Sequence, residues 1–130
     1  MREEAIVAVI VREGRILIIQ RAPLVPAAGY WTPVSGRLEP GERQADAVVR
    51  ETLEEVGIRV RPIQRVWQCP SSDGRYRLHW WLAEFVDGNI VLAPDEVSEA
   101  RWMTVQAFLA LEKTFVDDRY FFQHVFPQCQ

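Results

Sequence analysis

Cysteine is scarce in this sequence: only Cys69 and Cys129 occur among 130 residues, and neither belongs to a CxxC pair. A disulfide scaffold and a zinc site built from cysteines are therefore not expected. Low cysteine usage is typical of proteins from a reducing compartment, so we expect a cytoplasmic location.

Long apolar runs and an excess of basic charge are also missing. The longest apolar runs, residues 5–11 and 16–19, fall far short of the roughly 20 residues that cross a membrane as a helix. The 15 basic and 18 acidic residues give a net charge of −3, whereas binding to membrane surfaces or nucleic acid polymers usually needs a basic excess. We therefore expect neither a membrane nor a nucleic acid polymer as a partner.

Internal repeats, low-complexity tracts and Ser/Gly linkers do not interrupt the chain. A composition of 48% hydrophobic and 25% charged residues is typical of a globular protein. We therefore expect residues 1–130 to form a single domain.

The pattern along the chain predicts a mixed sheet with helices. Two segments rich in Ile and Val, residues 4–12 and 15–21, are separated by Glu13 and Gly14 and predict a β-hairpin. Residues 22–41 contain four prolines and three glycines, which predict a long ordered loop with at most short strands, a feature that is usually functional. Further strands are predicted over residues 58–69, 76–86, 90–92 and 100–105, and helical segments over 42–56, 104–113 and 117–126. This order indicates an α+β fold.

The helix predicted over residues 42–56 carries an unusual cluster of acids. Its apolar stripe, expected to face the core, comprises Ala45, Val49, Thr52, Leu53 and Val56. Glu51, Glu54 and Glu55 lie three and four residues apart beside that stripe, so their carboxylates can converge. Like charges at this spacing destabilise a helix, and a bound cation would offset the repulsion. Acid pairs on helices are most often simply solvated, but carboxylates are also the ligands that Mg²⁺ prefers.

The residues around this cluster resemble the signature of the Nudix hydrolases. Gly36, Glu42, Arg50-Glu51, Glu54-Glu55 and Gly57-Ile58 match eight of the nine specified positions. The exception is Thr52, where an aliphatic residue is usual. Just outside the signature, Ser35 replaces a frequent glycine.

The resemblance implies a three-layer α/β/α sandwich with a mixed β-sheet, the Nudix fold, and the residues of its catalytic site. Glu51, Glu54 and Glu55 would bind Mg²⁺, for which Mn²⁺ can substitute, together with the carbonyl of Ser35. Arg50 would orient the glutamates. Glu42 would either support them or lie favourably at the helix dipole. Gly36 would allow a backbone conformation that a side chain blocks, and Gly57 would end the helix.

The implied reaction is hydrolysis of a pyrophosphate bond in a nucleoside diphosphate-linked compound, of the nucleotide, nucleotide sugar or dinucleotide class. Water attacks phosphorus after a carboxylate removes its proton. We expect Glu54 or Glu55 as the general base, followed by Glu96 on a later loop, while Glu99 is more simply a solvated loop acid.

Residues outside the signature are candidates for substrate recognition. Arg21 and Arg37 can bind phosphates, and Tyr30 and Trp81 can stack on a base or line its pocket. The apolar segment 119–126 either docks on the sheet or forms a homodimer interface.

Two other functions share some of these features. An isopentenyl-diphosphate-isomerase-like enzyme would have the same fold, but the glutamates here are intact and the chain is short for that enzyme. A non-catalytic nucleotide-binding regulator would usually lack one of the glutamates, and none is missing.

Overall fold

The computed structural model describes residues 2–129 and contains one mixed sheet. The predicted hairpin is confirmed as β1 (Glu3–Arg12) and β2 (Arg15–Arg21). The remaining strands are β3 (Trp31–Thr32), β4 (Val34–Arg37), β5 (Arg59–Pro70), β6 (Tyr76–Asp87) and β7 (Val97–Met103). The sheet runs in the order β3-β2-β1-β6-β5, with β4 paired to β1 and β7 paired to β2. Only the pair of β1 and β6 is parallel among the strand pairs of the described residues.

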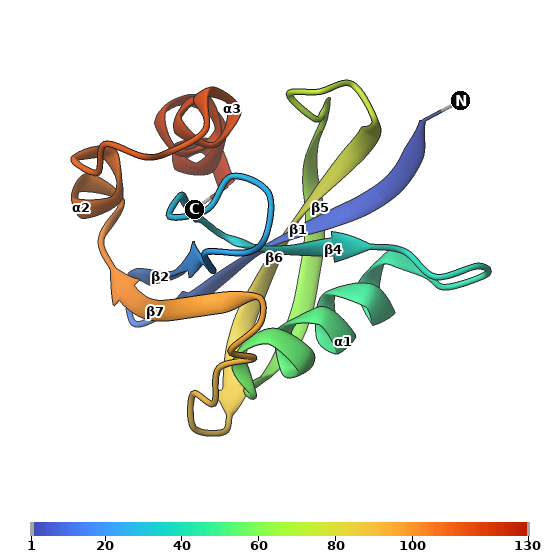
Figure 1. Cartoon of the computed structure of the whole chain (residues 1–130), viewed down its shortest axis with the longest axis horizontal. Helices are drawn as coiled ribbons and strands as arrows, with labels where there is room; N and C mark the ends of the chain where they lie inside the picture. The colour runs from blue at the N-terminus through green and yellow to red at the C-terminus, as the bar shows by residue number, and fades with distance from the viewer. Residues whose placement is uncertain (1, 130) are drawn as a thin grey trace.

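Helices cover both faces of this sheet. The helix α1 (Gln44–Val56) lies on one side, whereas α2 (Val105–Leu109) and α3 (Val116–Tyr120) lie on the other (Figure 1). A π-helical turn (Phe121–Val125) and a 3-10 turn (Phe126–Cys129) continue α3. The predicted α+β fold with three layers is therefore confirmed. None of the helices within residues 2–129 is long and apolar enough to cross a membrane.

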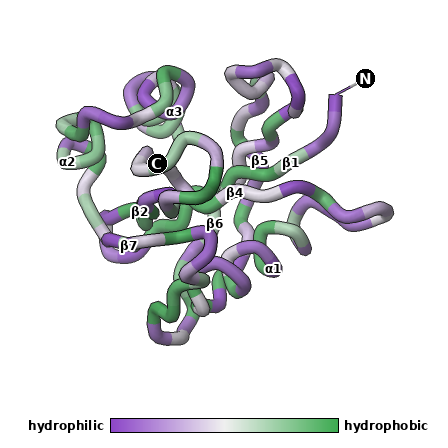
Figure 2. Tube along the Cα trace, viewed as in Figure 1, coloured by the Kyte–Doolittle hydropathy of each residue, from purple (hydrophilic) through white to green (hydrophobic). Residues whose placement is uncertain are grey.

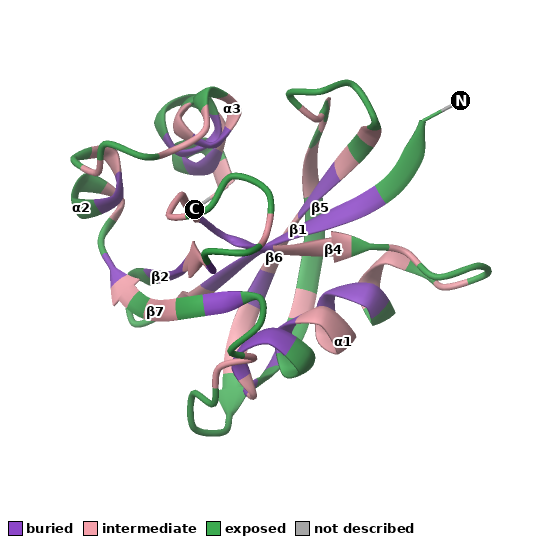
Figure 3. Ribbon diagram, in the orientation of Figure 1, coloured by how far each residue is buried: buried purple, intermediate pink, exposed green. Residues whose placement is uncertain are grey.

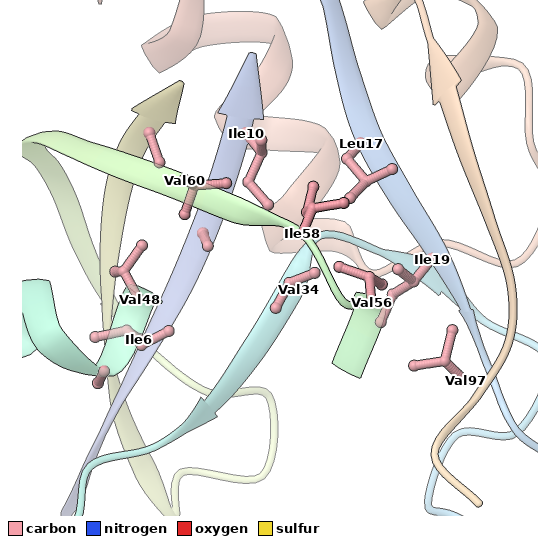
Figure 4. Packing of buried hydrophobic residues seen from close by; sticks show 13 residues of the cluster. Ile6, Ile10, Leu17, Ile19, Val34, Val48, Val56, Ile58, Val60 and Val97 are labelled. Atoms are coloured by element: carbon pink, nitrogen blue, oxygen red, sulfur yellow. The ribbon is translucent and has the colours of Figure 1, made fainter. Parts of the chain in front are cut away.

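The central strand β1 supplies side chains to two separate cores. Ile6 and Ile10 pack with Val48 and Val56 under α1, and Figure 4 shows this cluster. Val7 and Val9, on the opposite face, belong to the core that contains the aromatic side chains Trp80, Phe108, Phe121, Phe122 and Phe126. Successive side chains of a strand point to opposite faces, so a strand covered on both sides is apolar throughout. The middle of β1 is accordingly hydrophobic in Figure 2 and buried in Figure 3.

The apolar C-terminal segment docks on the sheet. The ring of Phe121 lies 4.3 Å from that of Trp80 in a stacked arrangement, and Phe121, Phe122 and Phe126 are all buried. Docking is thus confirmed as one of the two roles considered for this segment, and the homodimer stays a prediction.

Two sequence-based expectations for the region of α1 were wrong. Leu53, expected in the core, is 50% exposed, and the buried side chains of α1 are Ala47, Val48, Thr52, Glu55 and Val56. The hydrophobicity of Leu53 was misleading because the buried stripe includes an acid, Glu55, which no apolar pattern would count. Residues 90–92 are not a strand, because this segment instead satisfies backbone groups at the end of α1: the amide of Val91 donates to the carbonyl of Val56 at 2.9 Å.

Glycine 57 ends α1 as predicted. Its φ of 75° lies in the left-handed region, and its amide donates to the carbonyl of Leu53 at 3.0 Å. A residue with a β-carbon would be strained at this position.

Thr52, the departure from the aliphatic residue of the Nudix signature, is fully buried, and its Oγ1 has no hydrogen-bond partner. Replacing Thr52 with Val should raise the free energy of unfolding by about 1 kcal/mol, because an unpaired buried hydroxyl costs about 1–3 kcal/mol. Thermal unfolding in metal-free buffer should show a midpoint about 3–5 °C higher. Thr52→Ser is the matched control: it keeps the hydroxyl but loses the methyl group, and it should lower the midpoint. A Val variant less stable than the parent would contradict the expectation.

Candidate active site

A cleft of about 1000 Å³ lies between the face of α1 that carries the acids and the neighbouring strands of the sheet. Residues from the start of β1, the end of β2 and β4 line it on the side of the sheet. It is lined by Arg21 at the end of β2, by Ser35 to Arg37 of β4, and by Glu51 and Glu55 of α1. The loop before β7 contributes Glu96. The long proline-rich segment thus forms a wall of this cleft, as its length predicted.

Arg50 holds the acids of the cleft wall in place. Its Nε and Nη2 donate to the two carboxylate oxygens of Glu42 at 2.8 and 2.9 Å, while Nη1 donates to Glu51 at 2.8 Å and to Glu54 at 3.2 Å. Nη2 also donates to the carbonyl of Arg37 at 3.0 Å, which ties α1 to β4. The predicted ion pair of Arg50 with Glu54 thus belongs to the same network as its contacts with Glu42 and Glu51, while the orienting role of Arg50 stays a prediction.

Glu42 is a partner of Arg50 rather than of the helix amides. Its side chain is 13% exposed and forms a two-point contact with the guanidinium. The hydrogen bond from Arg50 is the main cause that lowers the pKa of Glu42, supported by a backbone bond from Glu39. A bidentate contact of this kind fixes both partners in one geometry.

Gly36 makes space for Glu51. A β-carbon on Gly36 would lie 2.1 Å from Cδ of Glu51, closer than atoms can approach. The φ of Gly36 is not positive, so a side chain is excluded here by lack of space and not by backbone strain. Close approach of β4 to the carboxylate of Glu51 is the reason for a glycine here.

Glu55 is a buried acid beside two other acids. It is only 6% exposed, and burial raises its pKa to about 9, with further contributions from the hydrogen bond and charge of Glu51 and from the charge of Glu96. Arg21 partly opposes this rise. Three carboxyl groups thus lie near one another, and only the guanidinium of Arg21 opposes their effect on the pKa of Glu55. Such a site favours the binding of further positive charge.

Comparison with known proteins agrees with this geometry. The family model described as NUDIX domain matches residues 1–125 of the chain. The chain belongs to the Nudix hydrolase family.

Individual relatives and structures support the assignment. The "NAD-capped RNA hydrolase NudC" of Pseudomonas putida is 37% identical over 101 residues, a match that covers 75% of this chain and 35% of that protein. The chain therefore spans about a third of the length of the NudC relatives it matches. The crystal structures of the MutT protein from Methanosarcina mazei Go1 and of a MutT NUDIX hydrolase from Burkholderia pseudomallei align with TM-scores of 0.84 and 0.82 at 23% and 25% identity. These alignments cover 99% and 96% of this chain, and 96% and 98% of the two structures.

The Nudix fold brings together only part of the predicted metal-ligand set. Glu51, Glu55 and Ser35 line the cleft together with Glu96. Glu54 is not part of the cleft lining; its side chain is 56% exposed beside Arg50. Across residues 2–129, no three Asp, Glu, His or Cys side chains are arranged as a complete set of metal ligands. A metal-binding or basic role for Glu54 stays a prediction.

The predicted substrate-binding residues divide into two groups. Arg21 and Arg37 line the cleft, and Nε of Arg21 also donates to the carbonyl of Pro26 at 2.6 Å. Tyr30 and Trp81 do not line it. Tyr30 packs against Phe115 with ring centres 4.8 Å apart, and Nε1 of Trp81 donates to Oε1 of Gln44 of α1 at 2.9 Å.

Other residues of the Nudix domain lie where the sequence pattern indicated no function. Glu3 and Glu4 of β1 line the far end of the cleft. Asp118 is buried beside an adjoining pocket. The pair Asp117-Asp118, directly before the apolar segment 119–126, was the only sequence signal for Asp118. Glu99, considered a loop acid, instead belongs to β7 and forms an ion pair with Arg101 at 2.8 Å.

Proposed function

We propose that this Nudix domain is a Mg²⁺-dependent pyrophosphohydrolase that cleaves a phosphoanhydride bond in a nucleoside diphosphate-linked compound. The observation that carries the proposal is the buried carboxyl of Glu55, which faces Glu51 and Glu96 in a cleft that also presents Arg21. The carboxylates can bind a divalent cation, and the guanidinium of Arg21 can bind the phosphate oxygens of a polyphosphate in the same cleft.

The oxygen donors of the cleft are chemically suited to a hard divalent cation, which would draw them together, since within residues 2–129 no three of them already form a complete ligand set. Glu51, Glu55 and the backbone of Ser35 would hold Mg²⁺, with Glu96 and Glu54 as further oxygen ligands, and Mn²⁺ would bind the same donors. The raised pKa of Glu55 supports this fit, because the site penalises its own negative charge unless a cation is present. When bound, the cation offsets the charge of the phosphate oxygens and lowers the pKa of a water molecule.

The residues of the chain position the substrate and accept a proton. Arg21 and Arg37 bind phosphate oxygens at the cleft wall. Arg50 is held by Glu42 and orients Glu51 through its own hydrogen bond to that carboxylate, so it acts as a positioning residue. The base takes the proton of the attacking water as phosphorus is attacked in line with the leaving phosphate. Glu55 and Glu96 line the cleft whereas Glu54 does not, so we place the base among the first two.

A substrate panel tests the activity. The protein is incubated with Mg²⁺ and nucleoside triphosphates, ADP-ribose, NADH or dinucleoside polyphosphates, and released phosphate, pyrophosphate and nucleoside monophosphate are measured. Because the NudC relatives are named for NAD-capped RNA, an NAD-capped oligonucleotide belongs in the panel. Nucleotide binding without any release would support a regulator instead, and isomerisation of isopentenyl diphosphate would support the isomerase.

Mg²⁺ should raise the melting temperature of the protein, because a ligand that binds only the folded state stabilises it by about 2.7 kcal/mol at a concentration of 100 times its Kd. Thermal unfolding is measured with and without millimolar Mg²⁺ for the parent and for Glu55→Gln, which should lose most of the shift. Glu84→Gln is the matched control, because Glu84 pairs with Arg61 on β5 and does not line the cleft. Equal shifts in both variants would place the cation elsewhere.

A further inference from the structure

The loop that precedes β7 connects three parts of the candidate active site. It carries Glu96, and it lies beside both the end of α1 that carries Glu55 and the end of β2 that carries Arg21. Figure 1 shows this loop between β6 and β7, next to the C-terminal end of α1. The three side chains all line the cleft, although each comes from a different element.

Three backbone hydrogen bonds join these residues in series. The amide of Ala93 donates to the carbonyl of Glu55 at 3.0 Å. The carbonyl of Ala93 accepts from the amide of Glu96 at 3.0 Å. The carbonyl of Glu96 in turn accepts from the amide of Ala22, also at 3.0 Å, and Ala22 directly follows Arg21. We call this series of three bonds the backbone bridge.

Close packing also holds the loop against the end of α1. The amide of Val91 donates to the carbonyl of Val56 at 2.9 Å. A β-carbon on Gly57 would lie 3.0 Å from Cβ of Val91, and one on Gly88 would lie 3.1 Å from Cα of Ile58. Side chains at these two glycines would therefore push the loop away from the helix, so the loop and the helix end fit each other closely.

The other end of the bridge coincides with an irregularity in the sheet. β2 pairs with β7 in regular register from Ile16 to Gln20, and the register shifts between Gln20 and Arg21. Pairing resumes with Arg21 opposite Val97. Shifts of this kind bend a strand and redirect its side chains, and they are frequent next to active sites. Arg21, directly after the shift, lines the cleft.

Glu96 needs support of this kind because it lies on an exposed turn. Loops generally move more than the elements they connect, and a displacement of about 1 Å can reduce the rate of a catalysed step by about 10²-fold. Backbone bonds to α1 and β2 hold the turn on both sides. They do not depend on the side chains of Ala93 and Ala22, so no pattern of residue types would indicate them.

We infer that the backbone bridge positions the acid of Glu96 against the rest of the site, and that the amides of Ala93 and Ala22 are positioning groups for the reaction. The inference rests on the proposed function, which assigns the residues at the two ends of the bridge to one reaction. Because all three bonds hold the same turn, the bridge should open and close as one unit.

Hydrogen exchange tests this unit without metal or substrate. Replacing Ala93 with lactic acid puts an ester in place of its amide, which removes the donor and keeps the side chain. In metal-free buffer, the amides of Glu96 and Ala22 should then exchange about five- to tenfold faster, the size expected for the loss of one backbone hydrogen bond. The same replacement of Ala110 is the matched control, because its amide donates to the carbonyl of Gln106 at the end of α2, outside the cleft. It should leave both exchange rates unchanged.

Turnover tests the positioning role, with whichever compound of the panel is cleaved. The ester at Ala93 should lower kcat about tenfold or more with little change in KM, whereas the ester at Ala110 should leave kcat within about twofold. In a protein that already carries Glu96→Gln, the ester at Ala93 should lower kcat by no more than about twofold further, because two changes that act through one residue are not additive. A merely structural role would give the same loss with and without Glu96→Gln.

The outcomes separate this inference from the proposed function. Unchanged exchange of the amides of Glu96 and Ala22, or an equal loss of kcat in both backgrounds, would overturn the positioning role. If the parent nevertheless hydrolysed a compound of the panel, the proposed activity would stand without it. If the parent cleaved none of them, the proposed function would fall, and faster exchange in the ester variant would then show only a structural link.

Discussion

Glu55→Gln should nearly abolish turnover while making the protein more stable without metal. The substitution removes one carboxylate from the acids of the cleft, and loss of a metal ligand or general base is expected to lower kcat by about 10²- to 10⁴-fold. The amide has almost the same shape as the carboxyl, so the packing of α1 should not change. Steady-state release of phosphate from whichever compound of the panel is cleaved measures the first effect.

The gain in stability should grow with pH. Burial raises the pKa of Glu55 to about 9 in the folded protein, from an ordinary value of 4.5. The folded state thus holds this proton more tightly than the unfolded chain does, so the parent loses stability as pH rises from 4.5 towards 9. Gln does not titrate and lacks this loss. The melting temperature of the variant should exceed that of the parent by more at pH 8 than at pH 5 in metal-free buffer.

Glu84→Gln serves again as the control, because the side chain of Glu84 is 47% exposed, pairs with Arg61 and lies outside the cleft lining. Its activity should stay within about twofold of the parent, since surface charges away from the site contribute little. An inactive Glu55→Gln variant that melted below the parent at pH 8 would show that this glutamate is needed for folding, and its loss of activity would then say nothing about catalysis.

The spacing within the signature was sufficient to predict which acids of α1 lie near the cleft and Arg50. Arg50 and Glu54 are four residues apart on α1, so helical spacing predicts their contact. Glu42 precedes α1, and its contact with Arg50 depends on the turn that leads into the helix. Strands were equally predictable wherever alternation or continuous apolar runs were long, as in β1 and β6. These features depend on residues that are close together in the sequence, so the sequence pattern is sufficient to predict them.

Contacts between distant segments could not be predicted in this way. Gly36 approaches Glu51 only because β4 passes directly beside α1, and the pattern alone could not distinguish a need for space from a need for positive φ. Asp118 and Thr32 are 86 residues apart and meet because α3 docks against β3. Helical spacing grouped Glu54 with Glu51 and Glu55. The side chain of Glu54 nevertheless points to the surface of α1, where it is 56% exposed and pairs with Arg50.

Gly36→Ala should inactivate the enzyme almost as completely as the loss of an acid. The new β-carbon would lie 2.1 Å from Cδ of Glu51 and 2.4 Å from each of its carboxylate oxygens. Because the end of a long side chain can move, the cost should appear as displacement of the carboxylate rather than as unfolding. A misplacement of about 1 Å at a catalytic group can reduce the rate by about 10²-fold, and kcat/KM should fall at least this far.

The Mg²⁺-dependent rise in melting temperature should decrease in parallel, since the displaced Glu51 also leaves Arg50, its partner at 2.8 Å. Gly14→Ala is the contrasting control. Gly14 has a φ of +77° and no atom within 4 Å of an added β-carbon, so alanine there should cost about 1 kcal/mol of stability through backbone strain and leave kcat/KM unchanged. If Gly36→Ala kept full activity and its response to Mg²⁺, the carboxylate of Glu51 would not be required where the structure places it, and the proposed metal site would have to be built from the other acids of the cleft.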